Sequence, residues 1–208
     1  MTAIAGLHYT IDFNFYEIDL SEAGDYLAKT VSQYANLMFR QETKIDIDFD
    51  EGSIKSNILI TGLLFTLTDY GSLRSTVDYL IKDAKTLQQI VTSELIKSGL
   101  DEKLILKQKR IHCAPDRIRR IFLAIDRLES NNSLTQDQQR KEISNIKSAI
   151  KNVCIELSDQ DASFFLNSIN KNYQPAPQDI PYWGGPHEIS ARDEDLKSPA
   201  VPFPKRPI

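Results

Sequence analysis

The chain has 208 residues, is 41% hydrophobic and 26% charged, and carries a formal net charge of −4. This composition is typical of a soluble globular protein with a sizeable core, and the negative charge argues against a protein that coats nucleic acid along its whole surface. The longest apolar run, 58-ILITGLLFTL-67, is half the roughly 20 residues that a membrane span needs, and the first residues lack the pattern of a secretion signal. Cys113 and Cys154 have neither metal-ligand nor short-loop disulfide spacing, so we expect a cytoplasmic protein.

The first part of the chain has the hydrophobic periodicity of a strand, a helix and a hairpin, in that order. Residues 8–18 alternate between apolar and polar, which predicts a half-buried strand. From Ser21 to about Gln41, apolar residues recur every three or four positions and predict an amphipathic helix. Two strands are then expected around the turn 50-DEGS-53. The residues expected to pair across this hairpin are Ile45, Ile47 and Phe49 on one strand and Ile54, Ile58 and Ile60 on the other.

A long helix is predicted after the hairpin. Apolar residues recur every three or four positions from Leu73 to Leu95, and this pattern stops near Gly99. Gly71 lies between this pattern and the apolar run before it. The sequence therefore leaves two alternatives for residues 61–98, one kinked helix or two separate helices.

A helical hairpin is predicted in the next part of the chain. Residues 101–112 form a polar, basic passage, and Pro115 is well placed in the first turn of a helix. A second helix begins near Gln136, and a short helical piece over 159–169 is expected to cover the hairpin. The predicted fold class is α+β: a small β-α-β-β sheet with a long helix (domain 1–100), a helical-hairpin domain (101–171) and an extended proline-rich docking tail (172–208).

The C-terminal tail has the composition of a docking segment. Eight of the nine prolines follow Tyr173, so the tail is not expected to form a long helix or a central strand. Tyr182, Trp183 and Phe203 are bulky apolar side chains spaced along this segment, and such residues anchor extended segments in the grooves of partners. An unbound terminus is the alternative interpretation.

An acidic run follows the predicted first helix. Carboxylates at alternate positions of a strand lie on one face, which suits a divalent cation but also suits a solvated sheet surface. The calcium-loop pattern begins in this run but fails where glycine and the bidentate glutamate belong, so we favour the exposed strand. A metal-dependent hydrolase or nuclease is the alternative, in which Glu42 and Lys44 would help to position metal and water. The candidate metal ligands of this alternative are Asp46, Asp48, Asp50 and Glu51.

A basic patch is predicted between residues 107 and 120. This stretch has a local charge of +5, which leaves −9 on the rest of the chain. Such asymmetry attracts acidic partners, and phosphate groups of nucleic acid would gain from it through counterion release. We favour a solvated face or a protein interface over nucleic-acid binding. The candidate contacts with an acidic partner or phosphate are Lys107, Lys109, Arg110, Arg117, Arg119 and Arg120.

The common catalytic motifs are missing from the sequence. Neither a G-x-S-x-G elbow nor a glycine-rich phosphate loop occurs. His112 and Cys113 are adjacent in the sequence, but adjacent side chains point in different directions in regular structure. We therefore predict no catalytic residue and no cofactor.

Two stretches, 51-EGSIK-55 and 70-YGSLRSTVDYLIKDAK-85, resemble an uncharacterised family of bacterial proteins with an EGS-[LI]-K hairpin and a Y-G-x-[FL]-R…D-Y-L-[IV]-K-D-A helix. The resemblance extends over about residues 40–130 and has no activity attached to it. It implies a bacterial protein of unknown role that is encoded beside partner proteins, for example as an accessory in a defence or mobile-element cassette.

These observations together predict a non-enzymatic subunit or adaptor of a bacterial multi-protein assembly. It would dock through helix faces and the tail, either to a protein partner or to further copies of itself. A metal-dependent hydrolase or nuclease and a nucleic-acid-binding accessory protein remain the alternatives.

Overall fold

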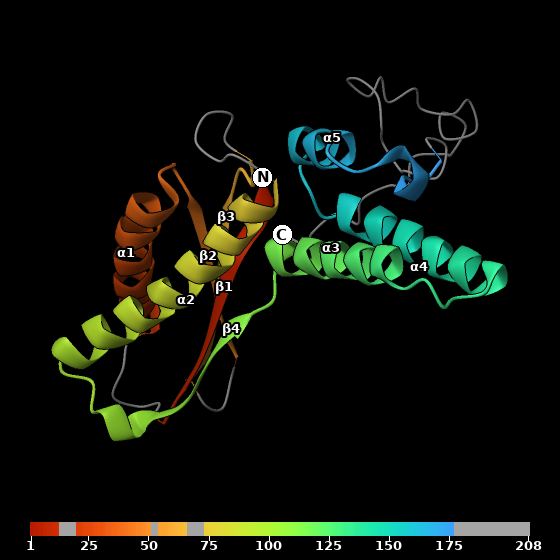
Figure 1. Cartoon of the computed structure of the whole chain (residues 1–208). Coiled ribbons are helices and arrows are strands. Elements are labelled where there is room, and N and C mark those ends of the chain that lie inside the picture. The colour runs from red at the N-terminus through yellow and green to blue at the C-terminus, as the bar shows by residue number, and fades with distance from the viewer. Residues whose placement is uncertain (13–19, 51–53, 66–72, 177–208) are drawn as a thin grey trace, which may run out of the picture.

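A computed structural model describes residues 1–12, 20–50, 54–65 and 73–176. The four strands form one layer, and the first two helices form a second layer on it. The three later helices lie beside these two layers (Figure 1). The strands are β1 (Thr2–Ile11), β2 (Lys44–Asp50), β3 (Ile54–Gly62) and β4 (Ile105–Ile111), and the helices are α1 (Leu20–Phe39), α2 (Leu73–Lys97), α3 (Ala114–Ser130), α4 (Gln136–Cys154) and α5 (Asp159–Asn167). Short 3-10 turns precede β4 (Glu102–Leu104) and follow α5 (Lys171–Tyr173).

The four strands form one antiparallel sheet in the order β2-β3-β1-β4. The chain order is therefore βαββαβ with β3 between β1 and β2, and β1 between β3 and β4. These are two split β-α-β units, the arrangement of ferredoxin-like folds. The α+β prediction with an N-terminal sheet is confirmed.

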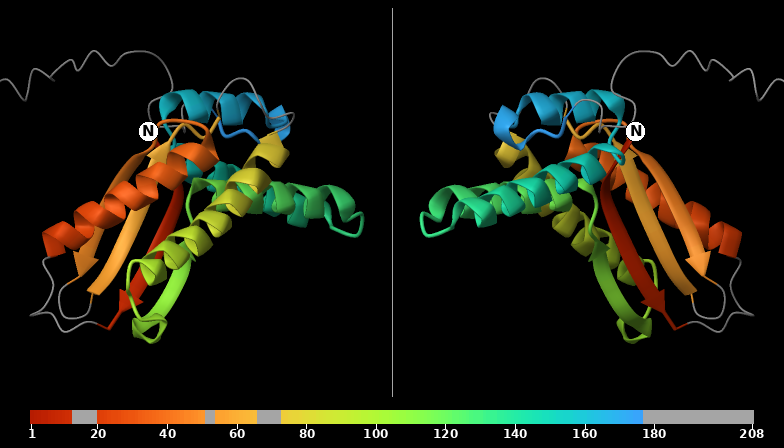
Figure 2. Two further views of the ribbon diagram at one scale, coloured as in Figure 1. Left: turned by 90° about the vertical axis from the view of Figure 1, so that its left-hand side faces the viewer. Right: turned by 90° about the vertical axis from the view of Figure 1, so that its right-hand side faces the viewer.

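Helices α1 and α2 cover one face of the sheet, as the two views of Figure 2 show. On β1, Leu7 and Tyr9 point to this face and are fully buried, whereas His8 and Thr10 point to the other face and are half-buried. This alternation is the period of two that the sequence predicts for a strand with one buried face. The opposite face is left open over most of its length by the described part of the chain.

The predicted hairpin is confirmed, with two of the expected isoleucine pairs, whereas Phe49 lies opposite Ser56. Ile45 lies opposite Ile60 and Ile47 lies opposite Ile58, all on the face that α1 and α2 cover. Ile58 and Ile60 are completely buried. The amphipathic helix predicted from Ser21 is also confirmed, as α1.

Three predictions about the extent of the elements were wrong. β1 begins at Thr2, six residues before the predicted strand, because the small residues at its start pack inside the sheet without showing clear alternation. The polar passage over 101–112 contains β4, an edge strand whose lysines hid its β character. Residues 61 and 62 belong to β3, and the only helix in the described part of 61–98 is α2, which begins at Leu73.

The helical hairpin is confirmed as α3 and α4, and α5 packs against it. The Thr135 hydroxyl accepts a hydrogen bond from the Gln138 amide at the start of α4, and Gln138 Oε1 accepts one from the Thr135 amide in return. At the start of α5, the Ser158 hydroxyl accepts a hydrogen bond from the amide of Asp161. Phe122 of α3 meets Phe165 of α5 edge to face, with ring centroids 6.3 Å apart.

Sheet and helical hairpin share one contiguous cluster of buried residues. Arg74, at the start of α2, donates two hydrogen bonds to Asp126 of α3 at 2.8 and 2.7 Å, and its guanidinium lies 5.1 Å from the centroid of the Phe122 ring. Whether the 1–100 and 101–171 segments behave as separate domains stays a prediction, although the fourth strand of the sheet comes from beyond residue 100.

Candidate functional site

Three residues of the acidic run, Asp46, Asp48 and Asp50, belong to β2, which is an edge strand of the sheet. Asp46 and Asp48 are exposed on the open face of the sheet, opposite Leu59 and Asn57 of β3. Lys44 Nζ lies 3.2 Å from Asp46 Oδ1, so this carboxylate already has a cationic neighbour. Within the described residues, no three His, Cys, Asp or Glu side chains lie close enough to hold a metal ion. Glu51 and the side chain of Asp50 fall outside that part, and the metal hypothesis is untested there.

The predicted basic patch is divided between two faces of the fold. Lys107 and Lys109 are exposed on β4, opposite Thr10 and His8 of β1, and therefore lie on the open face of the sheet. Together with Asp46 and Asp48 on the other edge, they give this face an acidic side and a basic side. Arg110 points to the opposite face.

Arg110 forms a largely buried pair with Asp116, at the start of α3; the two side chains are 11% and 9% exposed. Its two terminal nitrogens lie 2.6 and 2.5 Å from the two carboxylate oxygens, and His112 Nδ1 lies 3.3 Å from one of them. Burial alone would raise the pKa of Asp116, but the hydrogen bonds and charge of Arg110, with those of His112, outweigh it and lower this pKa below its ordinary value. Arg110 therefore stabilises the contact between β4 and the start of α3, and its charge is already paired within the fold.

The three predicted basic residues of α3, which are arginines, have different surroundings. Arg117 forms an ion pair with Glu156, beyond the end of α4, and Arg119 Nε lies 3.0 Å from Asp78 of α2. Arg117 and Arg120 both line a groove between α3 and α4. Of the six predicted basic residues, this groove brings together only these two.

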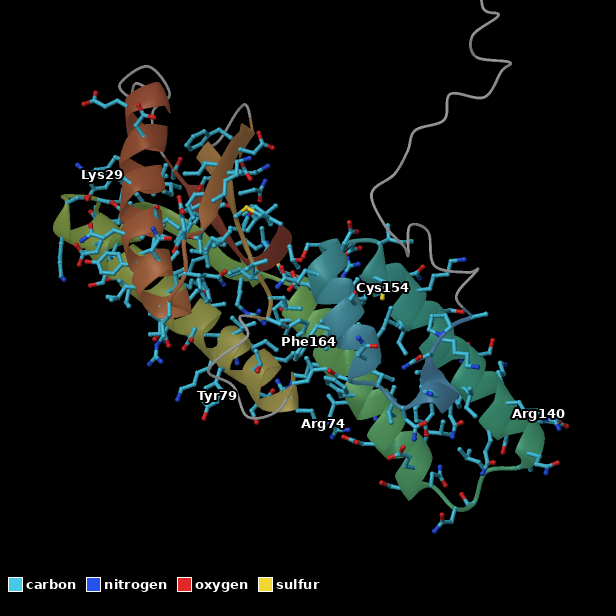
Figure 3. The ribbon with its side chains drawn as sticks, turned by 90° about the horizontal axis from the view of Figure 1, so that it is seen from above. Lys29, Arg74, Tyr79, Arg140, Cys154 and Phe164 are labelled. Carbon is cyan, nitrogen blue, oxygen red and sulfur yellow. The ribbon has the colours of Figure 1, made fainter. Side chains whose placement is uncertain are left out.

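The groove has a volume of about 480 Å³. Its rim holds Arg117 and Arg120 on α3 and polar residues including Glu142 on α4. Seen from above, the hairpin that contains it extends away from the sheet, with Arg140 at its far end (Figure 3). The apolar floor consists of Ile121, Ala124, Ile146, Ala149 and Val153.

The groove was missed at the level of sequence. The sequence feature that indicates the groove is a pair of small residues, Ala124 and Ala149, within the apolar stripes of the two helices. Both alanines are only partly buried, whereas Ile121 and Ile146 beside them are 3% exposed. Small residues in facing stripes leave a channel between two helices, because no side chain fills the space above them.

Two further hollows lie beside the sheet. One, of about 590 Å³ between α2 and β4, is lined by polar residues, and there Thr92 donates a hydrogen bond to Gln108 Oε1 at 2.6 Å. The other, of about 360 Å³, is lined mainly by apolar residues such as Ile11 and Phe49. The described side chains supply amides, hydroxyls and the ammonium groups of Lys85 and Lys97 to the first hollow and mostly hydrocarbon to the second.

The two cysteines are structural. Cys113 and Cys154 are 6% and 7% exposed. Burial raises the pKa of each thiol to about 11, so both stay protonated at neutral pH. A thiol in this state is a poor nucleophile.

The predicted docking residues of the tail, Tyr182, Trp183 and Phe203, lie outside the described residues. No helix in the described part of the chain is long and apolar enough to cross a membrane. The chain matches no protein-family model, no curated protein and no solved structure. The resemblance of 51–55 and 70–85 to a bacterial family therefore stays an expectation.

Proposed function

We propose that the protein is a non-enzymatic adaptor or assembly subunit whose α3–α4 groove binds an acidic segment of a protein partner. The observation that carries this proposal is the combination of an apolar floor with two arginines on one rim. A segment with apolar residues on one side and carboxylates on the other would satisfy both parts of the groove. Amphipathic helices bind such grooves between helices through anchors three and four residues apart.

The arginines supply specificity to this docking. Guanidinium groups bind carboxylates with two parallel hydrogen bonds and are weakly hydrated, so they suit a partly dry interface better than lysines do. Arg117 already has Glu156 as a partner, but both side chains are 45% exposed, so a second carboxylate can approach. Arg120 is exposed on the same rim.

A fluorescein-labelled peptide tests the proposal. Its leucines recur every three and four residues among glutamates, and its binding to the full chain is followed by anisotropy at low salt. Arg117→Glu with Arg120→Glu should weaken binding at least about tenfold, because two attractive contacts become repulsive. Lys107→Glu with Lys109→Glu changes the same number of charges on β4 and should leave binding within about twofold.

Equal weakening by both double variants would contradict the groove as the binding site, since only overall charge would then matter. A peptide that binds no form of the chain would contradict the proposed function altogether.

Nucleic-acid binding is a second candidate, favoured by Lys107 and Lys109 on the open face of the sheet. Binding of this kind would weaken as salt rises, because each neutralised phosphate releases counterions. Lys107→Glu with Lys109→Glu should then abolish binding of a duplex at low salt, whereas Arg117→Glu with Arg120→Glu should not. Binding that is independent of salt would contradict this candidate.

A further inference from the structure

We propose that segment 188–197 of the C-terminal tail occupies the α3–α4 groove of its own chain when no partner is bound. The inference rests on the proposed function of the groove and adds its regulation. The tail would act as an internal ligand that a partner must displace.

The composition of the segment complements the groove. The segment reads 188-EISARDEDLK-197 and contains four of the five acidic residues that follow residue 176, which outnumber its two basic residues and give it a net charge of −2. Three of them are consecutive, Asp193 to Asp195, and the apolar residues Ile189 and Leu196 lie on either side of this run. Carboxylates next to apolar side chains are what a groove with an arginine rim and an apolar floor can bind.

The described chain ends beside the helices that form the groove. The Tyr173 hydroxyl lies 3.1 Å from Glu129 Oε1 of α3. Gln174 Nε2 donates hydrogen bonds to the carbonyl oxygens of Leu166 and Ile169 at 2.7 and 2.9 Å. These contacts hold the start of the tail against α3 and the end of α5.

The chain between this point and the segment is long enough to reach the groove. Residues 177–187 number 11, and at about 3.3 Å per residue they span up to roughly 36 Å. A helix with its side chains is only about 10–12 Å thick, so this linker can pass around α3 or α4 with length to spare. A short linker gives a high effective concentration, which favours the groove of the same chain over that of a second copy.

Occupancy by the tail would lower the affinity for a partner. A ligand that binds only the open groove has an apparent affinity reduced by the fraction of molecules with an open groove. Any change that removes negative charge from 193–195 should therefore make the groove more available.

A disulfide trap in the full chain tests the contact directly. Ala149→Cys places a thiol on the floor of the groove, and Ala191→Cys places one in the tail segment. The native Cys113 and Cys154 should rarely form disulfides with the introduced cysteines, because both are buried. Mild oxidation of the double variant at low protein concentration should give a disulfide within one chain, seen as faster migration on a non-reducing gel.

The matched control pairs Ala191→Cys with Ser144→Cys, since Ser144 is exposed on α4 and does not line the groove. This pair should form the disulfide at least about tenfold more slowly. Equal rates for the two pairs would overturn the inference, because the tail would then contact the groove no more often than the rest of the surface. Disulfides only between chains would overturn it too, since the occupant would be the tail of a second copy.

A second readout separates this inference from the proposed function. Asp193→Asn, Glu194→Gln and Asp195→Asn in one chain should tighten binding of the labelled leucine–glutamate peptide by about fivefold. If the peptide binds the groove equally with or without these changes and no disulfide forms within a chain, the tail inference fails and the proposed function stands. If the disulfide forms but the peptide never binds, the groove serves the tail alone and the proposed function fails.

Discussion

Asp161 connects three segments that are far apart in the sequence. Its side chain is completely buried and accepts hydrogen bonds from the backbone amides of Leu64 and Phe65 at 3.0 and 3.1 Å. The hydroxyls of Thr2 and Ser158 also donate to it. One carboxylate thus joins the start of β1, the segment after β3 and the start of α5. A buried carboxylate with this many donors satisfies groups that would otherwise lack partners.

Asp161→Ala should lower the free energy of unfolding by about 3 kcal/mol, because at least two buried amides lose their acceptor. Urea denaturation followed by circular dichroism measures this change. Asp159→Ala is the control, since Asp159 lies in the same first turn of α5 but is exposed, and it should cost less than about 1 kcal/mol. Equal losses for the two variants would mean that the effect comes from the helix terminus instead of the buried junction.

The Arg110–Asp116 pair should make stability depend on pH. The pKa of Asp116 is lower in the folded chain than its unfolded value of about 3.9, so the pair stabilises the fold above that pH. This contribution is lost as the pH falls through the folded pKa. Arg110→Gln should therefore cost about 3 kcal/mol near neutral pH, and its difference from the wild type should shrink below about pH 4.

Urea midpoints at about pH 7 and about pH 3 measure this dependence. Arg119→Gln is the matched control, because it removes an exposed ion pair with Asp78 and should cost less than about 1 kcal/mol at either pH. A deficit of Arg110→Gln that is the same at both pH values would contradict the role given to the charge of Asp116.

At the scale of elements, the sequence was informative wherever one periodicity persisted over many residues. The stripes of α1, α2, α3 and α4 and the alternation of β2 and β3 predicted those elements correctly. β4 was missed because an edge strand is buried only in part, and its Lys107, Gln108 and Lys109 have the composition of a loop. Its place in the sheet depends on pairing with β1, which is almost 100 residues earlier in the chain and leaves no local signal.

The candidate site was predictable only in part, for the same reason. Arg117 and Arg120 were identified from charge, but charge does not show that Arg110 is paired inside the fold and that Arg119 contacts α2. The floor of the groove depends on which residues of α4 lie opposite Ala124. That register is a tertiary property of the hairpin.

Gly6 controls the pairing of β1 with β4. It lies opposite Ile111, and a Cβ atom at position 6 would lie 2.9 Å from Cβ of Ile111 and 3.3 Å from Sγ of Cys113. Gly6→Ala should therefore cost about 1–3 kcal/mol, because the two strands must move apart. Thermal unfolding measures the loss.

Gly24→Ala in α1 is the control for this substitution. Its Cβ would lie 3.1 Å from Cε2 of Phe49, at the end of a side chain that can turn aside, and alanine favours the helix. We expect a change within about 1 kcal/mol. Ile111→Ala should not rescue Gly6→Ala, since the closest atom, the Cβ of residue 111, remains. A rescue would show that the contact is with the outer part of the Ile111 side chain.

At the scale of the whole molecule, the sheet with its two helices is joined to the helical hairpin at several points. They share one contiguous buried cluster, and Arg74 of α2 contacts Asp126 and Phe122 of α3. Arg119 of α3 also pairs with Asp78 of α2, and Arg110 of β4 pairs with Asp116 of α3. Asp161 joins the sheet to α5, which packs against the hairpin. A joint of this extent favours one cooperative unfolding transition over two, because loss of one side exposes apolar surface of the other.

Phe165→Ala tests this cooperativity. Phe165 is completely buried in α5, so its removal should cost about 3–5 kcal/mol. If the molecule unfolds as one unit, hydrogen exchange of the Leu7 and Tyr9 amides in β1 should accelerate by the factor that this loss of global stability implies. Phe164→Ala is the control at the neighbouring position, where the ring is 40% exposed, and it should have a clearly smaller effect. Acceleration confined to α3, α4 and α5, with unchanged exchange in β1, would instead establish two domains that unfold independently.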